Sequence, residues 1–438
     1  MVISLFKKKE KSRVIIIGLD GVPYTLITTL LDKGIMPNLN SICKTGRLSQ
    51  MDTTIPDVSS VAWSSFITGV NPGKHNLYGF FEIHPKSYRY IFPQLSDLKS
   101  KLIWDILGKR TIAFNIPSTY PAQPINGIMV SGFVACELDK SVYPEELLMQ
   151  LKKINYRTDV DSSLGKDNKN KFIEDVYNTF SIHKNLLLDL LKNEEWDLFI
   201  GVITATDRLQ HFLIDAFFDE KHRYHTEFIN FYKEVDKFLG EVFSEKTDDV
   251  LFGIISDHGF TRLQKEINVN RILIEKGFLK VKGKEFTDIL SDTKAFCLTP
   301  GRIYIHYADK FRDGSVSRNG GFKIIDELTD IFKDLKFDDK KVIKDIYRPE
   351  VIYKGEYIVN APDLVLVSEY GFDIKGSLNK ENIFNDTHFT GMHTHDDAFL
   401  FLSEKYQKQR PHILDVTATI AGFFDKEIIK QLDGENLL

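Results

Sequence analysis

The sequence predicts an α/β fold: a doubly wound, mostly parallel sheet with helices on both faces. Short and almost wholly apolar runs recur along the chain, which is typical of strands buried on both faces. Segments with apolar residues at helical spacing lie between these runs, and such alternation favours a parallel sheet. With 438 residues, 42% of them hydrophobic and 27% charged, the chain is long enough for one large domain with insertions or for two domains.

The elements can be placed in order along the chain. The predicted strands occupy residues 14–19, 111–115, 127–131, 198–203, 250–256, 364–368 and 398–402. Helical patterns lie at residues 185–192, 225–245 and 324–332. The pattern at 225–245 is the clearest, because its apolar residues fall on one face: Phe228, Phe231, Val235, Phe238 and Val242. The polar stretch DSSLGKDNKNK, residues 161–171, is expected to be a loop.

Two breaks in this rhythm suggest how the chain is divided. We expect a flexible N-terminus at residues 1–12 and a core formed by residues 13–261 and 363–438. Residues 262–362, which include the charge run DDKK, are expected to form an inserted smaller subdomain that completes or covers a site.

Composition excludes several classes of function. The formal net charge of −5 gives no electrostatic reason to expect bulk nucleic-acid binding. Three scattered cysteines, Cys43, Cys136 and Cys297, are too few for a disulfide framework, so we expect reduced thiols in a cytoplasmic chain. No stretch approaches the roughly 20 apolar residues of a membrane span, so no transmembrane segment is expected.

Carboxylates and imidazoles gather near the ends of the predicted strands. Ligands of open α/β sheets bind at the carboxyl ends of the strands, so these side chains are expected along one edge. Each residue alone is more often a helix cap or a loop residue. Four such coincidences at one edge instead predict a shared site made of Asp20, Asp207, His211, Asp257, His258 and His393.

The ligand chemistry of this set indicates metal ions. Oxygen and nitrogen ligands without a thiolate suit Zn²⁺, with Mn²⁺ or Fe as alternatives. Six ligands are too many for one tetrahedral ion and enough for two. The set therefore predicts two divalent metal ions.

A nucleophile is expected in residues 53–76. Ser59–Ile67 has helical potential, and a hydroxyl in its first turn would lie at the positive end of the helix dipole. That position favours a phosphoryl group. The alternative is that Asp57, Ser59 or Ser60 only caps the helix.

Nine stretches of the chain, taken in order, resemble the alkaline-phosphatase superfamily. The resemblance is to its type I phosphodiesterase/nucleotide pyrophosphatase branch, and within it to a prokaryotic group described as predicted phosphohydrolases or phosphomutases. The stretches include VIIIGLDG, AWSSFITGVNPGKH, TDRLQHF, SDHGF and GMHTHDDAFL, and the nine together span residues 14–400.

This resemblance implies an alkaline-phosphatase-like core and roles for individual residues. Asp20, Asp257 and His258 match the ligands of one ion, whereas Asp207, His211 and His393 match those of the other. Ser59, nine residues before Thr68, matches the nucleophile that bridges the metals, with Ser60 as the alternative. The backbone N–H of Ser60 and the side chain of Arg208 are the candidate substrate-binding groups.

The activity implied is hydrolysis of a small phosphate ester or nucleotide, as in a phosphodiesterase or nucleotide pyrophosphatase, through a covalent phospho-serine. A phosphomutase or a phosphomonoesterase using the same site is an alternative. A third reading is a metal-structured binding protein without turnover. A sulfatase is disfavoured, because none of the cysteines lies in the required C-x-P-x-R context.

Overall fold

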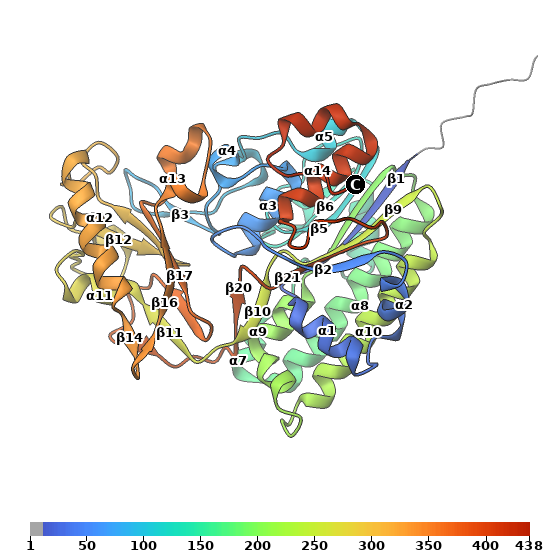
Figure 1. Cartoon of the computed structure of the whole chain (residues 1–438), viewed down its shortest axis with the longest axis horizontal. Coiled ribbons are helices and arrows are strands. Elements are labelled where there is room, and N and C mark those ends of the chain that lie inside the picture. Colours follow the sequence, from blue (N-terminus) through green and yellow to red (C-terminus); the bar gives the residue numbers. More distant parts are fainter. Residues whose placement is uncertain (1–11) are drawn as a thin grey trace, which may run out of the picture.

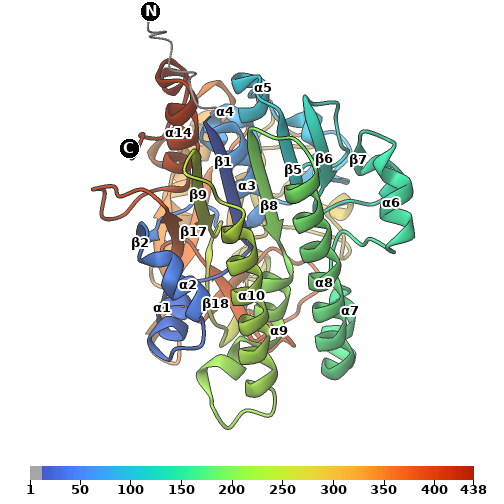
Figure 2. The same ribbon diagram turned by 90° about the vertical axis from the view of Figure 1, so that its right-hand side faces the viewer.

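A central eight-stranded sheet organises the larger part of the molecule. The structure is a computed structural model that describes residues 12–438, so the N-terminus expected to be flexible lies, except for residue 12, outside the described residues. The strand order is β2-β21-β9-β1-β8-β5-β6-β7, and Figure 2 shows most of these strands side by side. Their bounds are β1 (Arg13–Leu19), β2 (Arg47–Met51), β5 (Thr111–Ile116), β6 (Gly127–Ser131), β7 (Val142–Tyr143), β8 (Leu198–Ile203), β9 (Val250–Ile255) and β21 (Ala398–Leu402).

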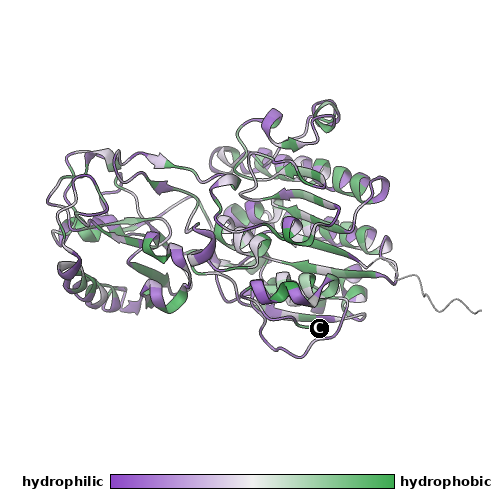
Figure 3. Cartoon of the chain, turned by 90° about the horizontal axis from the view of Figure 1, so that it is seen from above, coloured by the Kyte–Doolittle hydropathy of each residue, from purple (hydrophilic) through white to green (hydrophobic). Residues whose placement is uncertain are grey.

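The strands from β9 to β6 run parallel, whereas β21 and β7 pair antiparallel with their neighbours. Side chains of β1 alternate between two hydrophobic cores: Val14 and Ile16 enter one, Ile15 and Ile17 the other. Helices therefore cover both faces, and the predicted α/β fold is confirmed. In Figure 3 the strands of this sheet are mostly hydrophobic.

Helices of the two faces differ in size. One face is covered by α1 (Tyr24–Asp32), α2 (Pro37–Cys43), α8 (Lys169–Asn193), α9 (Ala205–Phe218) and α10 (His225–Ser244). The other face carries α3 (Ser59–Thr68), α5 (Ile103–Leu107) and α14 (Ile413–Phe424). The short helices α4 (Pro72–His75), α6 (Leu147–Lys153) and α7 (Ser162–Asp167) and the strand pair β10 (Gly259–Arg262) with β20 (Gly391–Thr394) complete this part, which we call the core lobe. Within residues 12–438, no helix is both long and apolar enough to cross a membrane.

A second hydrophobic core defines a small lobe at the left of Figure 1. Its larger sheet has the order β12-β13-β17-β16, and a second sheet the order β18-β11-β19. The bounds are β3 (Glu82–Ile83), β4 (Tyr90–Ile91), β11 (Lys265–Asn268), α11 (Val269–Glu275), β12 (Ala295–Leu298), β13 (Arg302–Ile305), α12 (Arg318–Lys333), β14 (Lys336–Phe337), β15 (Lys340–Lys341), β16 (Ile343–Tyr347), α13 (Pro349–Ile352), β17 (Leu364–Ser368), β18 (Phe372–Lys375) and β19 (Phe384–Asn385).

Two local expectations are wrong. The strand at residues 364–368 forms, but as β17 it pairs with β13 and β16 of the small lobe and not within the parallel sheet. An apolar run predicts that a strand is buried, but it does not predict which sheet the strand joins. Residues 161–171 are not a loop, because Asp161 caps α7 and Asn168 caps α8 through their side chains. The division at residues 262 and 362 stays a prediction; the small-lobe core extends to Ile374 and also includes Ile83.

Asp236 of α10 caps the N-terminus of α2 from outside that helix. Its carboxylate accepts hydrogen bonds from the backbone N–H groups of Asn38 and Leu39 at 3.1 and 2.8 Å. Asp236→Ala is expected to lower the free energy of unfolding by about 2 kcal/mol, because buried donors of α2 lose a charged acceptor. Urea unfolding measures the change. Glu234→Ala on the same helix removes only an exposed ion pair and is the matched control; equal shifts would contradict the capping role.

Candidate active site

The hydroxyl of Ser59 lies buried at the first turn of α3. The N-cap residue of this helix is Val58, which makes no side-chain capping bond, so neither Asp57, Ser59 nor Ser60 is the cap. Ser59 Oγ instead lies 3.3 Å from Oδ1 of Asp20 and 3.1 Å from Nε2 of His258. The hydroxyl therefore points at a carboxylate and an imidazole, and it makes no capping hydrogen bond to α3.

Asp20, Asp257 and His258 form one half of the cluster. Asp20 directly follows β1, and the other two follow β9 after Ser256, so the parallel pairing of these strands brings them together. Nε2 of His258 lies 3.7 Å from Asp20 Oδ1 and 3.4 Å from Asp257 Oδ2. The His258 ring donates from Nδ1 to the carbonyl of Gly259 at 3.0 Å, which leaves the Nε2 lone pair facing the cluster.

Asp207, His211 and His393 form the other half. Asp207 and His211 lie one turn apart on α9, and His393 comes from β20. Nε2 of each histidine lies 3.4 Å from Oδ1 of Asp207, and the two Nε2 atoms are 3.0 Å apart. His393 donates from Nδ1 to the carbonyl of Asp57 at 2.9 Å, so its Nε2 also faces inward. The second half thus contacts the segment that carries Ser59.

The two halves meet at Asp207. Candidate ligand atoms of Asp207, His211 and His393 lie within 4.8 Å of one another, and so do those of Asp20, Asp207 and His258. All six side chains predicted from the strand ends therefore converge on one place.

Keeping these three buried carboxylates ionised costs free energy unless a cation lies among them. Burial, followed by the charges of Asp257 and Asp207, holds the pKa of Asp20 well above its usual range, and burial raises the pKa of Asp257 to about 7. Burial alone would raise the pKa of Asp207, but His211, His393 and Arg208 hold it well below its usual range. Burial lowers the pKa of His211 to about 3 and holds the pKa of His258 well below its usual range, so these two imidazoles are kept neutral. Burial alone would lower the pKa of His393 as well, but Asp207 raises it above its ordinary value.

The donor set fits a metal. Oδ1 of Asp207 and Oδ2 of Asp257 are buried oxygens without a hydrogen-bond partner among residues 12–438. Such orphaned carboxylate oxygens are rare unless a ligand or ion satisfies them. Together with inward-facing imidazole nitrogens they are the atoms that a divalent cation takes.

Arg208, predicted to bind substrate, is engaged by two carboxylates. Its Nη1 donates to Asp207 at 2.9 Å, while Nε and Nη2 donate to Asp159 at 2.9 and 2.7 Å. The guanidinium carbon lies 4.3 Å from the centre of the Phe133 ring. Ser60, the other predicted group, is 2% exposed, and within the described part of the chain its hydroxyl has no hydrogen-bond partner.

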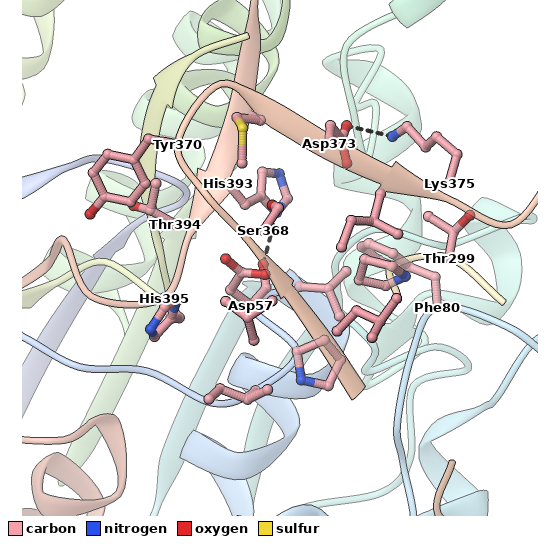
Figure 4. Close-up of a pocket in the computed structure, with 18 of the residues that line it drawn as sticks. Asp57, Phe80, Thr299, Ser368, Tyr370, Asp373, Lys375, His393, Thr394 and His395 are labelled. Carbon is pink, nitrogen blue, oxygen red and sulfur yellow. Dashed lines mark hydrogen bonds and ion pairs between the residues drawn. The ribbon is translucent and has the colours of Figure 1, made fainter. Parts of the chain in front are cut away.

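A cavity of about 200 Å³ adjoins His211 and His393, between the core lobe and the small lobe (Figure 4). Asp57 and His395 line it from the core lobe. Asp373 and Lys375 of β18, which form an ion pair at 2.6 Å, line it from the small lobe. The cavity therefore has charged groups of both lobes beside the second half of the cluster.

Several contributors to the site carry no signal in the sequence. Trp63 donates from its indole nitrogen to Asp20 at 3.2 Å, yet in the sequence it is one apolar residue of a helix. Asp159 lies in a polar stretch far from any predicted strand end, and Lys375 lies in the small lobe. The one indication of Asp159 in the sequence is Arg208 beside Asp207, since a buried arginine requires carboxylate partners.

Solved structures of low identity share this architecture. Phosphonoacetate hydrolase from Sinorhizobium meliloti 1021, in complex with phosphonoacetate, is 15% identical with a TM-score of 0.63, and 96% of each chain is covered. Murine ectonucleotide pyrophosphatase/phosphodiesterase 5, an inactive variant with AMP, is 12% identical with a TM-score of 0.56 over 94% of this chain and 95% of that one. Alkaline phosphatase PafA is 11% identical with a TM-score of 0.58 over 98% of each. The chain therefore has the alkaline-phosphatase-like fold.

The sequence itself matches the family described as type I phosphodiesterase/nucleotide pyrophosphatase over residues 14–396. The chain belongs to this family, and it is a hydrolase of phosphoric ester or pyrophosphate bonds. No curated protein matches the sequence closely enough to count as a relative.

Proposed function

We propose that the protein is a two-metal phosphodiesterase or nucleotide pyrophosphatase that uses Ser59 as nucleophile. The observation that carries the proposal is the position of the Ser59 hydroxyl, within 3.3 Å of both Asp20 and His258 in a cluster with orphaned carboxylate oxygens. The ions would be held by Asp20, Asp257 and His258 on one side and by Asp207, His211 and His393 on the other. Zinc is the expected metal, with manganese or iron as alternatives.

When bound, such ions supply positive charge for the phosphoryl oxygens and lower the pKa of hydroxyl and water. In the first step Ser59 loses its proton to solvent and Oγ attacks phosphorus. The bond to the leaving oxygen breaks, and that oxygen departs with a proton. In the second step a water oxygen attacks phosphorus, the bond to Ser59 Oγ breaks, and Ser59 regains a proton. The backbone N–H of Ser60, in the first turn of α3, would donate to a phosphoryl oxygen.

Charge pairing near the cluster favours a diester over a monoester. A monoester carries one more negative charge than a diester, and binding it would require a cationic side chain that is not already paired. Arg208 is already bound by Asp159 and Asp207, and Lys375 by Asp373. A small phosphate ester or a nucleotide derivative is the expected substrate, and a cytoplasmic location stays a prediction.

Bis(p-nitrophenyl) phosphate tests the proposal. Turnover is expected to fall by about 100-fold or more after dialysis against EDTA and to return with Zn²⁺ or Mn²⁺. The reason is that the ions would supply the positive charge that activates Ser59 and the phosphoryl group. p-Nitrophenyl phosphate is the monoester control and is expected to be the poorer substrate. Hydrolysis in ¹⁸O-water is expected to place one label in the phosphomonoester product. Turnover that EDTA does not affect contradicts the metal-dependent reaction, and an unlabelled product favours the phosphomutase.

A further inference from the structure

Arg302 of β13 is a fully buried arginine that donates hydrogen bonds to Phe81, Glu82 and Thr299. Nη2 donates to the carbonyl of Phe81 at 2.8 Å and to that of Thr299 at 2.9 Å. Nη1 forms an ion pair with Glu82, and the hydroxyl of Tyr304 donates to the other oxygen of Glu82 at 2.9 Å. The arginine therefore fixes the main chain and the side chain of residues 81–82 to the small lobe.

Gly79 allows the close approach of this arginine. A Cβ atom at residue 79 would overlap the guanidinium group of Arg302. The guanidinium is held by hydrogen bonds to Phe81, Glu82 and Thr299, so it has little freedom to move aside. A buried arginine is a costly way to obtain stability alone, since apolar residues of similar size often serve as well. This cost indicates that the geometry of residues 79–82 matters.

Phe80 lies between Gly79, which packs against Arg302, and residues 81–82, which Arg302 binds. It lines the cavity of Figure 4 and also a second cavity of about 220 Å³ that includes Ser60. Its ring packs edge-on against Phe133, with the ring centres 5.5 Å apart. Phe80 is therefore a wall shared by two cavities, one of which adjoins His393 and the other the residue after Ser59.

The two cavities differ in chemistry. The first contains the charged groups Asp57, Asp373 and Lys375. The residues that line the second are uncharged, and among them is the buried, unpartnered hydroxyl of Ser60. A phosphodiester carries two substituents on one phosphorus atom, so a pair of unlike cavities beside one nucleophile suits a diester with unlike halves.

We propose that Phe80 is a specificity-determining residue that separates the two ester substituents, and that Arg302 is the positioning residue that holds it in place. The polar or charged substituent occupies the first cavity and the uncharged one the second. This inference rests on the proposed phosphodiesterase function and adds to it the recognition of both halves of the substrate.

Two substrates with the same leaving group test the inference: phenyl p-nitrophenyl phosphate and methyl p-nitrophenyl phosphate. The parent protein is expected to prefer the phenyl ester, measured as the ratio of the two kcat/KM values. Phe80→Ala joins the cavities and is expected to lower this ratio about tenfold, mainly through KM. Arg302→Lys keeps the charge but loses the fork of hydrogen bonds, and it is expected to lower the ratio in the same direction.

The double variant decides whether Arg302 acts through Phe80. In the Phe80→Ala background, Arg302→Lys is expected to change the ratio by less than about twofold, since the wall it positions is already missing. Leu328→Ala, in the buried core of the same lobe, is the matched control for general destabilisation and is expected to keep the parent ratio. Zinc affinity, measured by chelator competition, is expected to be unchanged in all variants.

Other outcomes overturn the inference in distinct ways. A parent ratio retained by Phe80→Ala excludes Phe80 as the wall, and full additivity of the two substitutions excludes Arg302 as its positioning residue. Should Arg302→Lys not fold, Glu82→Gln disturbs the same contact at a partly exposed side chain and must lower the ratio. If the zinc-loaded parent hydrolyses neither diester, the proposed function fails, and this inference fails with it. If it hydrolyses both equally well, only this inference fails.

Discussion

Replacement of Ser59 by alanine is expected to lower kcat/KM for bis(p-nitrophenyl) phosphate by about 10³-fold or more. Ser59 is 5% exposed, and the substitution removes its hydroxyl oxygen, which lies between Asp20 and His258. A nucleophile has no substitute at that position, whereas a hydroxyl that only stabilised α3 would matter little to turnover. Val58, not Ser59, is the N-cap, so the helix is expected to keep its stability.

Two neighbouring serines make the test specific. Ser60→Ala removes the other candidate hydroxyl and is expected to change kcat/KM by less than about tenfold. Ser64→Ala removes a buried and unpartnered hydroxyl of the same helix and controls for packing. Acid-quenched protein, digested and analysed by mass spectrometry, is expected to carry a phosphoryl adduct on Ser59. A large loss in Ser60→Ala with near-parent activity in Ser59→Ala would assign the nucleophile to Ser60.

The strand ends allowed much of this site to be predicted from the sequence. Asp20, Asp207 and Asp257 follow apolar runs, and parallel strands bring such positions to one edge whatever lies between them in the chain. His393 was found for a similar reason, since it precedes the last apolar run. Its exact approach, through β20 and the carbonyl of Asp57, depends on tertiary pairing and could not be predicted.

The remaining parts of the site depend on contacts between distant residues, which no local sequence pattern indicates. Asp159 reaches Arg208 from a segment nearly fifty residues away, and Arg302 reaches Phe81 and Glu82 across more than 200 residues of chain. Nothing local marks either residue, because each is held by a charged partner that lies far away in the sequence. The strand β17 shows the same limit for the fold: its composition predicts burial, while its partners in the small lobe are set by the chain around it.

In the metal-free protein, Asp257→Asn is expected to increase stability at pH 8 and not at pH 4. Burial raises the pKa of Asp257 to about 7 in the folded state, above its ordinary value near 3.8. A carboxyl group with a raised folded pKa contributes stability below the unfolded pKa, and this contribution is lost as the pH rises toward 7. The neutral amide avoids that loss, and the gain at pH 8 is on the order of 2–4 kcal/mol.

Zinc is expected to reverse the order of stability. The parent offers a buried carboxylate oxygen without a hydrogen-bond partner, whereas the variant offers an amide. Binding at 1,000 times Kd adds about 4.1 kcal/mol to the stability of the folded parent, which exceeds the gain from the substitution without metal. The variant, which lacks one charged ligand, is expected to gain much less. Urea unfolding at pH 8, with EDTA and with Zn²⁺, gives the four midpoints required.

Asp397→Asn separates the effect of burial from the effect of ligation. Burial also raises the pKa of Asp397, to about 6, but its carboxylate accepts hydrogen bonds from Thr25 and lies outside both groups of candidate ligands. Its pH trend without metal is therefore expected to resemble that of Asp257→Asn, while its response to zinc stays that of the parent. If zinc stabilises Asp257→Asn as much as the parent, Asp257 is not a ligand. If zinc leaves the parent midpoint unchanged, the cluster does not hold this metal, and the two-metal reaction loses its basis.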